Sequence, residues 1–152
     1  MFSKKIEINL EKPDDIIHLE PISDIHIGHA GFDEEHYKKR IKAISKDKNR
    51  YTFFGGDALD AITTYDKRFN PDMSLEHDID NQRLRWQNLS QKLFDIHAEQ
   101  KNEKVWGFFH GNHDYKIPQI SRAYLQNTMC TPNNLTFMGS RGVLGLEIKY
   151  NK

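Results

Sequence analysis

The chain has 152 residues, enough for one domain with a substantial core. Its 22 basic and 22 acidic side chains cancel, and 11% of its residues are aromatic. This composition excludes an intrinsically disordered protein and disfavours a dedicated nucleic-acid binder, which usually carries a basic excess. Cys130 is the only cysteine, so a secreted domain held together by internal disulfides is excluded as well.

No segment approaches the roughly 20 apolar residues that a membrane span needs. Residues 1–10 alternate charged and apolar side chains and lack the apolar stretch of a signal peptide. We therefore expect a cytoplasmic protein with no membrane association.

The first third of the chain predicts two strands followed by a helix. Apolar residues alternate over residues 5–10, and residues 16–23 form a second β-prone run, in which Pro21 indicates an edge strand or a bulge. Asp33 is the predicted N-cap of a helix that ends near residue 48. Two glutamates follow this aspartate, where the helix dipole favours them, and apolar residues then recur at helical spacing.

The rest of the chain continues the alternation of strand and helix. Wholly β-prone runs predict buried strands over residues 51–54 and 105–110. Between them lie a polar loop, residues 61–74, and a long helix with apolar residues recurring from 75 to 96. This alternation favours a right-handed parallel α/β layer. Beyond that layer, the sequence predicts a short helix and two more strands, at residues 121–127, 135–138 and 143–150.

Three short polar strings follow predicted strands in chain order. They read Asp24-Ile25-His26, Gly56-Asp57-Ala58-Leu59-Asp60 and Gly111-Asn112-His113-Asp114. In open α/β sheets the ligand crevice lies outside the carboxyl ends of the parallel strands, so these strings predict a site there. Carboxylates mixed with imidazoles are donors for a pair of divalent metal ions, which assist phosphate-ester hydrolysis when held roughly 3.5 to 4 Å apart.

Local geometry gives these residues a chemical interpretation and a structural one. Asp24 and His26 alternate along an expected extended segment, so both side chains would converge on one ion, although such a pair is more often a hydrogen-bonded loop pair. Asp57 follows two glycines, which allow a sharp turn into the crevice, and it could equally cap a helix over residues 58–62. In that helix Asp60 would lie one turn further along the same side.

The three strings resemble the calcineurin-like metallophosphoesterase superfamily, whose first half reads D-x-H, G-D-x-x-D and G-N-H-D/E. All three motifs match without substitution. The resemblance implies a layered α/β sandwich whose first half has parallel strands and flanking helices, with residues 1–152 forming a single, incomplete metallophosphoesterase domain. It also implies hydrolysis of a phosphate mono- or diester, and the net charge gives no support to nucleic acid as the substrate.

The resemblance assigns metal ligands residue by residue. Asp24 and His26 would bind the first ion, Asp57 would bridge the two, and Asn112 would give its amide oxygen to the second. The cofactors would be two divalent metal ions, for which manganese, iron or zinc is expected.

The resemblance also assigns the acid chemistry. His113 would be the general acid that protonates the leaving oxygen, and Asp60 would orient it. Lys67 and Arg68, in the loop after Asp60, could meet a substrate phosphate, although solvated loop charges are the commoner case.

One part of the family pattern is absent from this sequence. The second half of the family carries a further metal-binding histidine and a G-H-x-H string, whereas no histidine follows His113. The chain is therefore expected to be either a fragment or a protein that lacks part of the site. Two alternatives stay open: a non-catalytic interaction module of the same fold, or a half-site that a partner chain completes.

Overall fold

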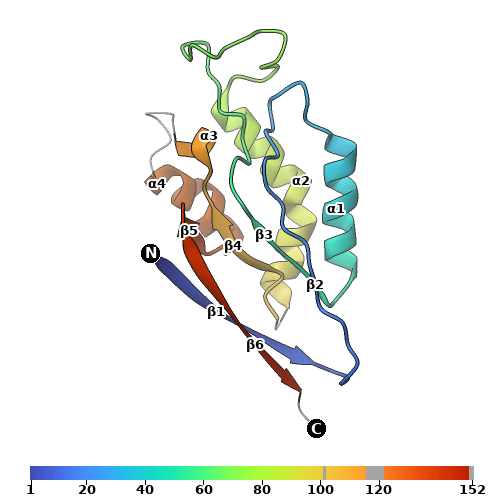
Figure 1. Ribbon diagram of the computed structural model, residues 1–152. Coiled ribbons are helices and arrows are strands. Elements are labelled where there is room, and N and C mark those ends of the chain that lie inside the picture. Colours follow the sequence, from blue (N-terminus) through green and yellow to red (C-terminus); the bar gives the residue numbers. More distant parts are fainter. Residues whose placement is uncertain (101, 116–121, 151–152) are drawn as a thin grey trace.

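The computed structural model describes residues 1–100, 102–115 and 122–150, and it is a mixed α/β structure with parallel sheets and flanking helices (Figure 1). None of the helices in these residues is both long enough and apolar enough to cross a membrane. The strands are β1 (Phe2–Leu10), β2 (His18–Leu19), β3 (Arg50–Phe54), β4 (Val105–Phe109), β5 (Phe137–Gly139) and β6 (Gly142–Tyr150). The α-helices are α1 (Glu34–Lys46), α2 (Ile79–Glu99), α3 (Asn112–Tyr115) and α4 (Arg122–Leu125).

Four parallel strands form the main sheet in the order β2-β3-β4-β5. The predicted buried strands β3 and β4 lie at its centre, and α1 and α2 run side by side next to it (Figure 1). Trp86 of α2 contacts Phe54 of β3 and Phe108 of β4, with ring centroids 5.3 and 5.7 Å away. All three rings are buried, and each such burial stabilises the fold by about 1.5–3 kcal/mol.

Strands β1 and β6 form a second, two-stranded parallel sheet. Ile6 and Ile8 of β1 pack against Tyr51 and Trp106 of the main sheet, away from the core that the helices cover. Trp106 faces this side because side chains alternate along a strand, and Val105 before it faces the helices. Two residues of β4, Trp106 and Gly107, then lie opposite one of β3, a shift in register that returns Phe108 to the side of the helices. The molecule is therefore layered: helices, main sheet and small sheet.

The second predicted strand is shorter than expected. β2 covers two residues, but the backbone N–H groups of Glu20 and Ile22 still donate to carbonyls of β3, at 2.9 and 3.0 Å. Pro21 lies between them and has no N–H to donate. β2 is an edge strand, so the edge position that Pro21 indicated is confirmed.

The two long helices were predicted correctly apart from one boundary. Asp33 caps α1 as expected, because its side chain accepts a hydrogen bond from the backbone N–H of His36 at 2.9 Å. The second helix begins at Ile79, later than expected, and Asp78 is its N-cap. Leu75 is 67% exposed, and its N–H donates instead to the carbonyl of Gly28. This bond ties the loop before α2 to the loop that carries the first polar string.

The C-terminal elements contain one topological surprise. Both predicted strands exist, but β5 pairs with β4 in the main sheet, whereas β6 crosses to pair with β1. The predicted helix over residues 121–127 is α4 followed by a π-helical turn, Gln126–Cys130, and residue 121 lies outside the described residues. Cys130 is buried, as is usual for a free cysteine in a core.

Candidate metal centre

The three polar strings meet at the carboxyl end of the main sheet, beneath the long loop between β3 and α2 (Figure 1). Hydrogen bonds fix the first string against the second. The backbone N–H groups of Asp24 and His26 donate to the carbonyls of Gly56 and Asp57, each at 3.0 Å. Parallel pairing between these segments therefore continues beyond the regular strands.

The backbone of these strings is left-handed at three non-glycine positions, which corrects the extended geometry expected for Asp24 and His26. The φ angles are +53° at Asp24, +50° at His26 and +51° at Asp57. This conformation costs a non-glycine residue roughly 1–2 kcal/mol, although aspartate and histidine tolerate it better than most. Such strain gathers at functional sites, where the surrounding structure enforces it.

Two glycines allow the second and third strings to touch. Gly56 has a φ of +106°, and a Cβ there would lie 2.5 Å from the backbone nitrogen of Gly111. A Cβ on Gly111 would lie 2.1 Å from Oδ1 of Asp57. The predicted sharp turn before Asp57 is thus confirmed, and Gly111 has a role of its own because the Asp57 carboxylate packs directly on it.

Asp114 holds the second and third strings together, a role that the sequence reasoning did not assign. Its Oδ2 accepts hydrogen bonds from the backbone N–H groups of Asp57, at 2.8 Å, and Gly111, at 3.0 Å. Its side chain is fully buried, and this burial raises the pKa of its carboxyl group above the ordinary value. The only available signal was its place as the last residue of the third string.

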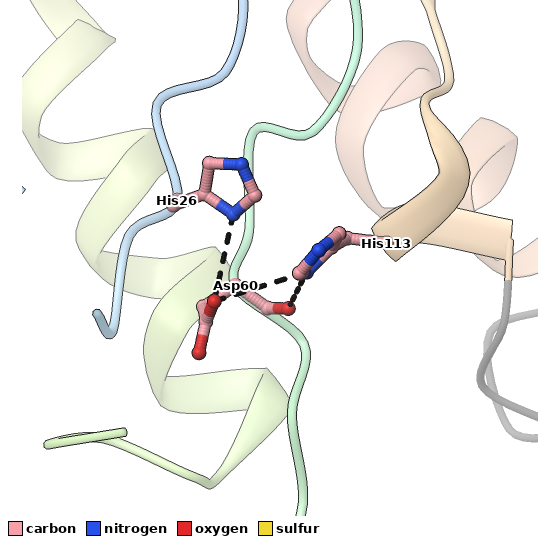
Figure 2. Close-up of side chains that lie close together, drawn as sticks. All are labelled: His26, Asp60 and His113. Atoms are coloured by element: carbon pink, nitrogen blue, oxygen red, sulfur yellow. Dashed lines mark hydrogen bonds and ion pairs between the residues drawn. The ribbon is translucent and has the colours of Figure 1, made fainter. Parts of the chain in front are cut away.

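Asp60 lies between two imidazoles, and Figure 2 shows that the three side chains come from three different segments. Its Oδ1 is 3.5 Å from Nδ1 of His26 and 3.8 Å from Nδ1 of His113. The two imidazole centroids are 4.5 Å apart. Together these residues offer ligand atoms that all lie within 4.8 Å of one another. The Asp60 carboxylate is also the main reason that the pKa of His26 is raised.

The expected helix over residues 58–62 is absent, so Asp60 is not placed by a helical turn. The segment is extended instead, with Leu59 bridged to Ile27 and the N–H of Asp60 donating to the carbonyl of Ile27 at 3.0 Å. The Asp60 side chain is only 1% exposed, and neither carboxylate oxygen has a hydrogen-bond donor within the described residues. A buried carboxylate without donors is costly, and a bound cation would stabilise it.

A second group of possible ligands adjoins the first. Asp24, His26 and Asp57 also offer ligand atoms within 4.8 Å of one another. His26 belongs to both groups, whereas the resemblance gave the bridging place to Asp57. Oδ1 of Asp57 accepts a hydrogen bond from the backbone N–H of His113 at 2.7 Å, so the two groups are rigidly connected. We refer to these five residues as the candidate centre: Asp24, His26, Asp57, Asp60 and His113.

The remaining predicted ligand, Asn112, is exposed at the first residue of α3. It directly precedes His113, and its role as a metal ligand stays a prediction. A hollow of about 390 Å³ opens over the candidate centre, with Ile62 and His29 also in its lining. His29 has a structural task, because its Nδ1 accepts a hydrogen bond from the N–H of Gly31 at 2.9 Å.

The chain was also compared with known proteins. No protein-family model, curated protein or solved structure matches it.

Proposed function

We propose that this protein hydrolyses a phosphate mono- or diester with the help of divalent metal ions bound at the candidate centre. The observation that carries the proposal is the burial of the Asp60 carboxylate without a donor, between two imidazoles and beside two further aspartates. This arrangement fits metal ions and is hard to explain as a purely structural cluster. We further propose that the layered fold is the first part of a metallophosphoesterase sandwich.

The donor set suits a divalent metal of intermediate hardness. Carboxylate oxygens combined with imidazole nitrogens favour manganese, iron or zinc over calcium. Asp24, His26 and Asp57 would hold one ion, with Asp60 or Asn112 offering donors towards a second. When bound, such ions lower the pKa of a water molecule towards neutrality and neutralise charge on the phosphoryl oxygens.

His113 is suited to give a proton to the leaving oxygen. Its Nδ1 lies 2.6 Å from the backbone carbonyl of Asp60, and a carbonyl only accepts, so this nitrogen carries a hydrogen. The other ring nitrogen, Nε2, is therefore the atom that would carry the transferable proton. Asp60 thus orients the ring through its backbone carbonyl, and its carboxylate stays available to a cation.

The test contrasts Asp57→Asn with His113→Ala, by manganese calorimetry and by turnover on phosphate esters with good and poor leaving groups. Asp57→Asn should lose metal and activity together, because it removes a charged ligand. His113→Ala should keep its metal while turnover falls by about 10²- to 10⁴-fold, with the smaller loss on nitrophenyl esters, whose leaving group needs no proton. Asp14→Asn, which changes an exposed aspartate outside the three strings, is the matched charge control.

Two outcomes would contradict the proposal. If His113→Ala also loses metal, His113 is a ligand and the general-acid role is wrong. If the wild-type protein binds manganese without turning over any ester, a non-catalytic module of the same fold is the better conclusion.

A further inference from the structure

The loop between Asp60 and α2 brings one guanidinium to the candidate centre. Arg68 lies in this loop, which rises above the carboxyl end of the main sheet in Figure 1. Its Nη1 is 3.4 Å from Nε2 of His113. Lys67, its neighbour, is exposed and has no hydrogen bond or ion pair to the centre within the described residues. The structure therefore distinguishes two cations that the sequence left equivalent.

Asp66 fixes the orientation of this guanidinium. Its carboxylate accepts from Nε of Arg68 at 3.0 Å and from Nη2 at 2.6 Å, a two-point pairing along one edge of the planar group. Oδ1 also accepts from the backbone N–H of Arg68 at 2.9 Å, which closes a tight local turn. The long arginine side chain is therefore held in one orientation. Its conformational entropy is already reduced before any ligand binds.

The part of the guanidinium that does not pair with Asp66 faces the imidazole of His113. Nη1 takes no part in the pairing with Asp66 and lies 3.4 Å from Nε2 of His113. A guanidinium only donates, so Nε2 is the acceptor in this arrangement, and a substrate oxygen that replaces it as the acceptor leaves Nε2 able to carry a proton. An ester oxygen within hydrogen-bond reach of Nε2 therefore lies close to Nη1 as well. The three aspartates of the candidate centre supply negative charge nearby, so a cation at its rim also offsets repulsion of an incoming phosphate.

We infer that Arg68 anchors the phosphoryl group of the substrate and that Asp66 is the residue that positions it. The inference rests on the proposed function, because it assumes that a phosphate ester occupies the candidate centre. Arginine suits the task because its planar donors match two oxygens of one phosphate, and charge-assisted bonds of this kind are about twice as strong as neutral ones. The role is in binding, and it requires no bond to be made or broken by Arg68.

The test compares Arg68→Ala, Asp66→Asn and the matched control Lys67→Ala in the 152-residue chain loaded with manganese. The readouts are manganese affinity, kcat and KM on 4-nitrophenyl phosphate, and the inhibition constant of inorganic phosphate. Arg68→Ala should raise KM and the phosphate inhibition constant together by roughly 10- to 100-fold, the usual effect of removing one charged hydrogen bond. Manganese affinity should stay unchanged.

The two other variants sharpen the assignment. Asp66→Asn should raise both constants by a smaller factor, about 3- to 10-fold, because the guanidinium remains but loses its fixed orientation. Lys67→Ala should change neither constant by more than about twofold, since an exposed, screened charge contributes little.

The outcomes separate this inference from the proposed function. If the wild-type protein binds manganese and hydrolyses the ester while Arg68→Ala leaves both constants within twofold, the anchor is wrong and the proposed function stands. Equal effects of Lys67→Ala and Arg68→Ala would also overturn it, because they would show a diffuse charge effect. A wild-type protein that neither binds manganese nor hydrolyses the ester overturns both.

Discussion

The small β1–β6 sheet and the candidate centre are built on opposite principles. In the small sheet, nine consecutive residue pairs lie in regular parallel register, with Ile6 and Ile8 buried against the main sheet. Its outer face carries an alternating ladder in which Lys5 pairs with Glu147 and Lys149 with Glu7. The backbone there is regular strand, and no residue of β1 or β6 has a positive φ.

The candidate centre shows the reverse. Three of its residues have a left-handed backbone, and a buried carboxylate has no hydrogen-bond donor within the described residues. It exists because the strands below it and the bonds from Asp114 hold the loops together. The packed helices and sheets therefore supply the free energy of folding. The loops at the strand ends hold the strained backbone that a binding site requires.

The largest expected effect comes from one methyl group placed in each region. Gly111→Ala puts a Cβ 2.1 Å from Oδ1 of Asp57, so the carboxylate must move and metal affinity should fall by at least tenfold. Gly145→Ala in β6 places its Cβ 3.9 Å from the nearest atom, the carbonyl oxygen of Lys4, and should stabilise the fold by about 0.5–1 kcal/mol. Calorimetric metal titration and thermal melts on both variants measure the contrast. Equal metal affinity in the two would show that contact between the strings is unimportant.

A second prediction concerns the contact between the two sheets. Ile8→Ala removes a side chain that is 1% exposed and should lower the free energy of unfolding by about 2–5 kcal/mol. Metal affinity of the folded fraction should not change, because Ile8 belongs to a separate apolar cluster from the one beneath the centre. Urea denaturation gives the first quantity, and titration well below the denaturation midpoint gives the second. A parallel loss of metal affinity would mean that the two regions are coupled.

A third prediction is that replacing Asp60 increases the stability of the metal-free protein and weakens its metal binding. Asp60→Asn removes a buried charge whose contacts to His26 and His113 are long, at 3.5 and 3.8 Å, and it breaks no hydrogen bond. At alkaline pH, where imidazoles are neutral, the metal-free variant should therefore be more stable than the wild type by about 1–2 kcal/mol. It should also bind manganese more weakly, and metal should therefore stabilise the wild type more than the variant. Thermal melts of both proteins with and without manganese test whether the order of their stabilities changes when metal is added. A variant less stable than the metal-free wild type would show that the ion pairs of Asp60 with His26 and His113 outweigh the cost of burying its charge.

The smallest expected effect is a pH dependence of the folding stability that comes from His97, a buried residue of α2. His97 of α2 is buried, which lowers its pKa, and its Nδ1 accepts a hydrogen bond from the N–H of Val105 at 3.3 Å. The pKa of His97 is lower in the folded protein than in the unfolded chain. The stability that the neutral imidazole contributes is therefore fully present above pH 6.5 and is lost as the pH falls through the folded pKa. His97→Gln should therefore destabilise the protein by about 1–2 kcal/mol at pH 7.5 and by less at pH 5.

Urea denaturation of both proteins across this pH range measures that difference. His36 is exposed on α1, so His36→Gln is the control. Its difference in stability from the wild type should not become smaller as the pH falls. A constant gap between His97→Gln and the wild type from pH 7.5 to pH 5 would rule out the neutral, buried imidazole as its source.

Local sequence patterns were enough to predict much of the fold. The cap at Asp33, the edge position of the strand near Pro21 and the two buried central strands all follow from short-range chemistry, and all are confirmed. The crossing of β6 to β1 could not be predicted in this way, because its alternating pattern fits either sheet and the choice depends on partners more than 130 residues away.

The residue types and their order along the chain were enough to predict which residues could form the site and at which end of the sheet they would lie. Aspartates and histidines after β-prone runs were sufficient for that, because parallel strands end at a common edge. How these residues meet depends on long-range packing. His26 is shared between two ligand groups, Asp114 holds two strings together, and Arg68 rather than Lys67 approaches His113. These relations join segments up to 87 residues apart, as the ligand group that contains His26 and His113 does, and spacing along the chain carries no information about them.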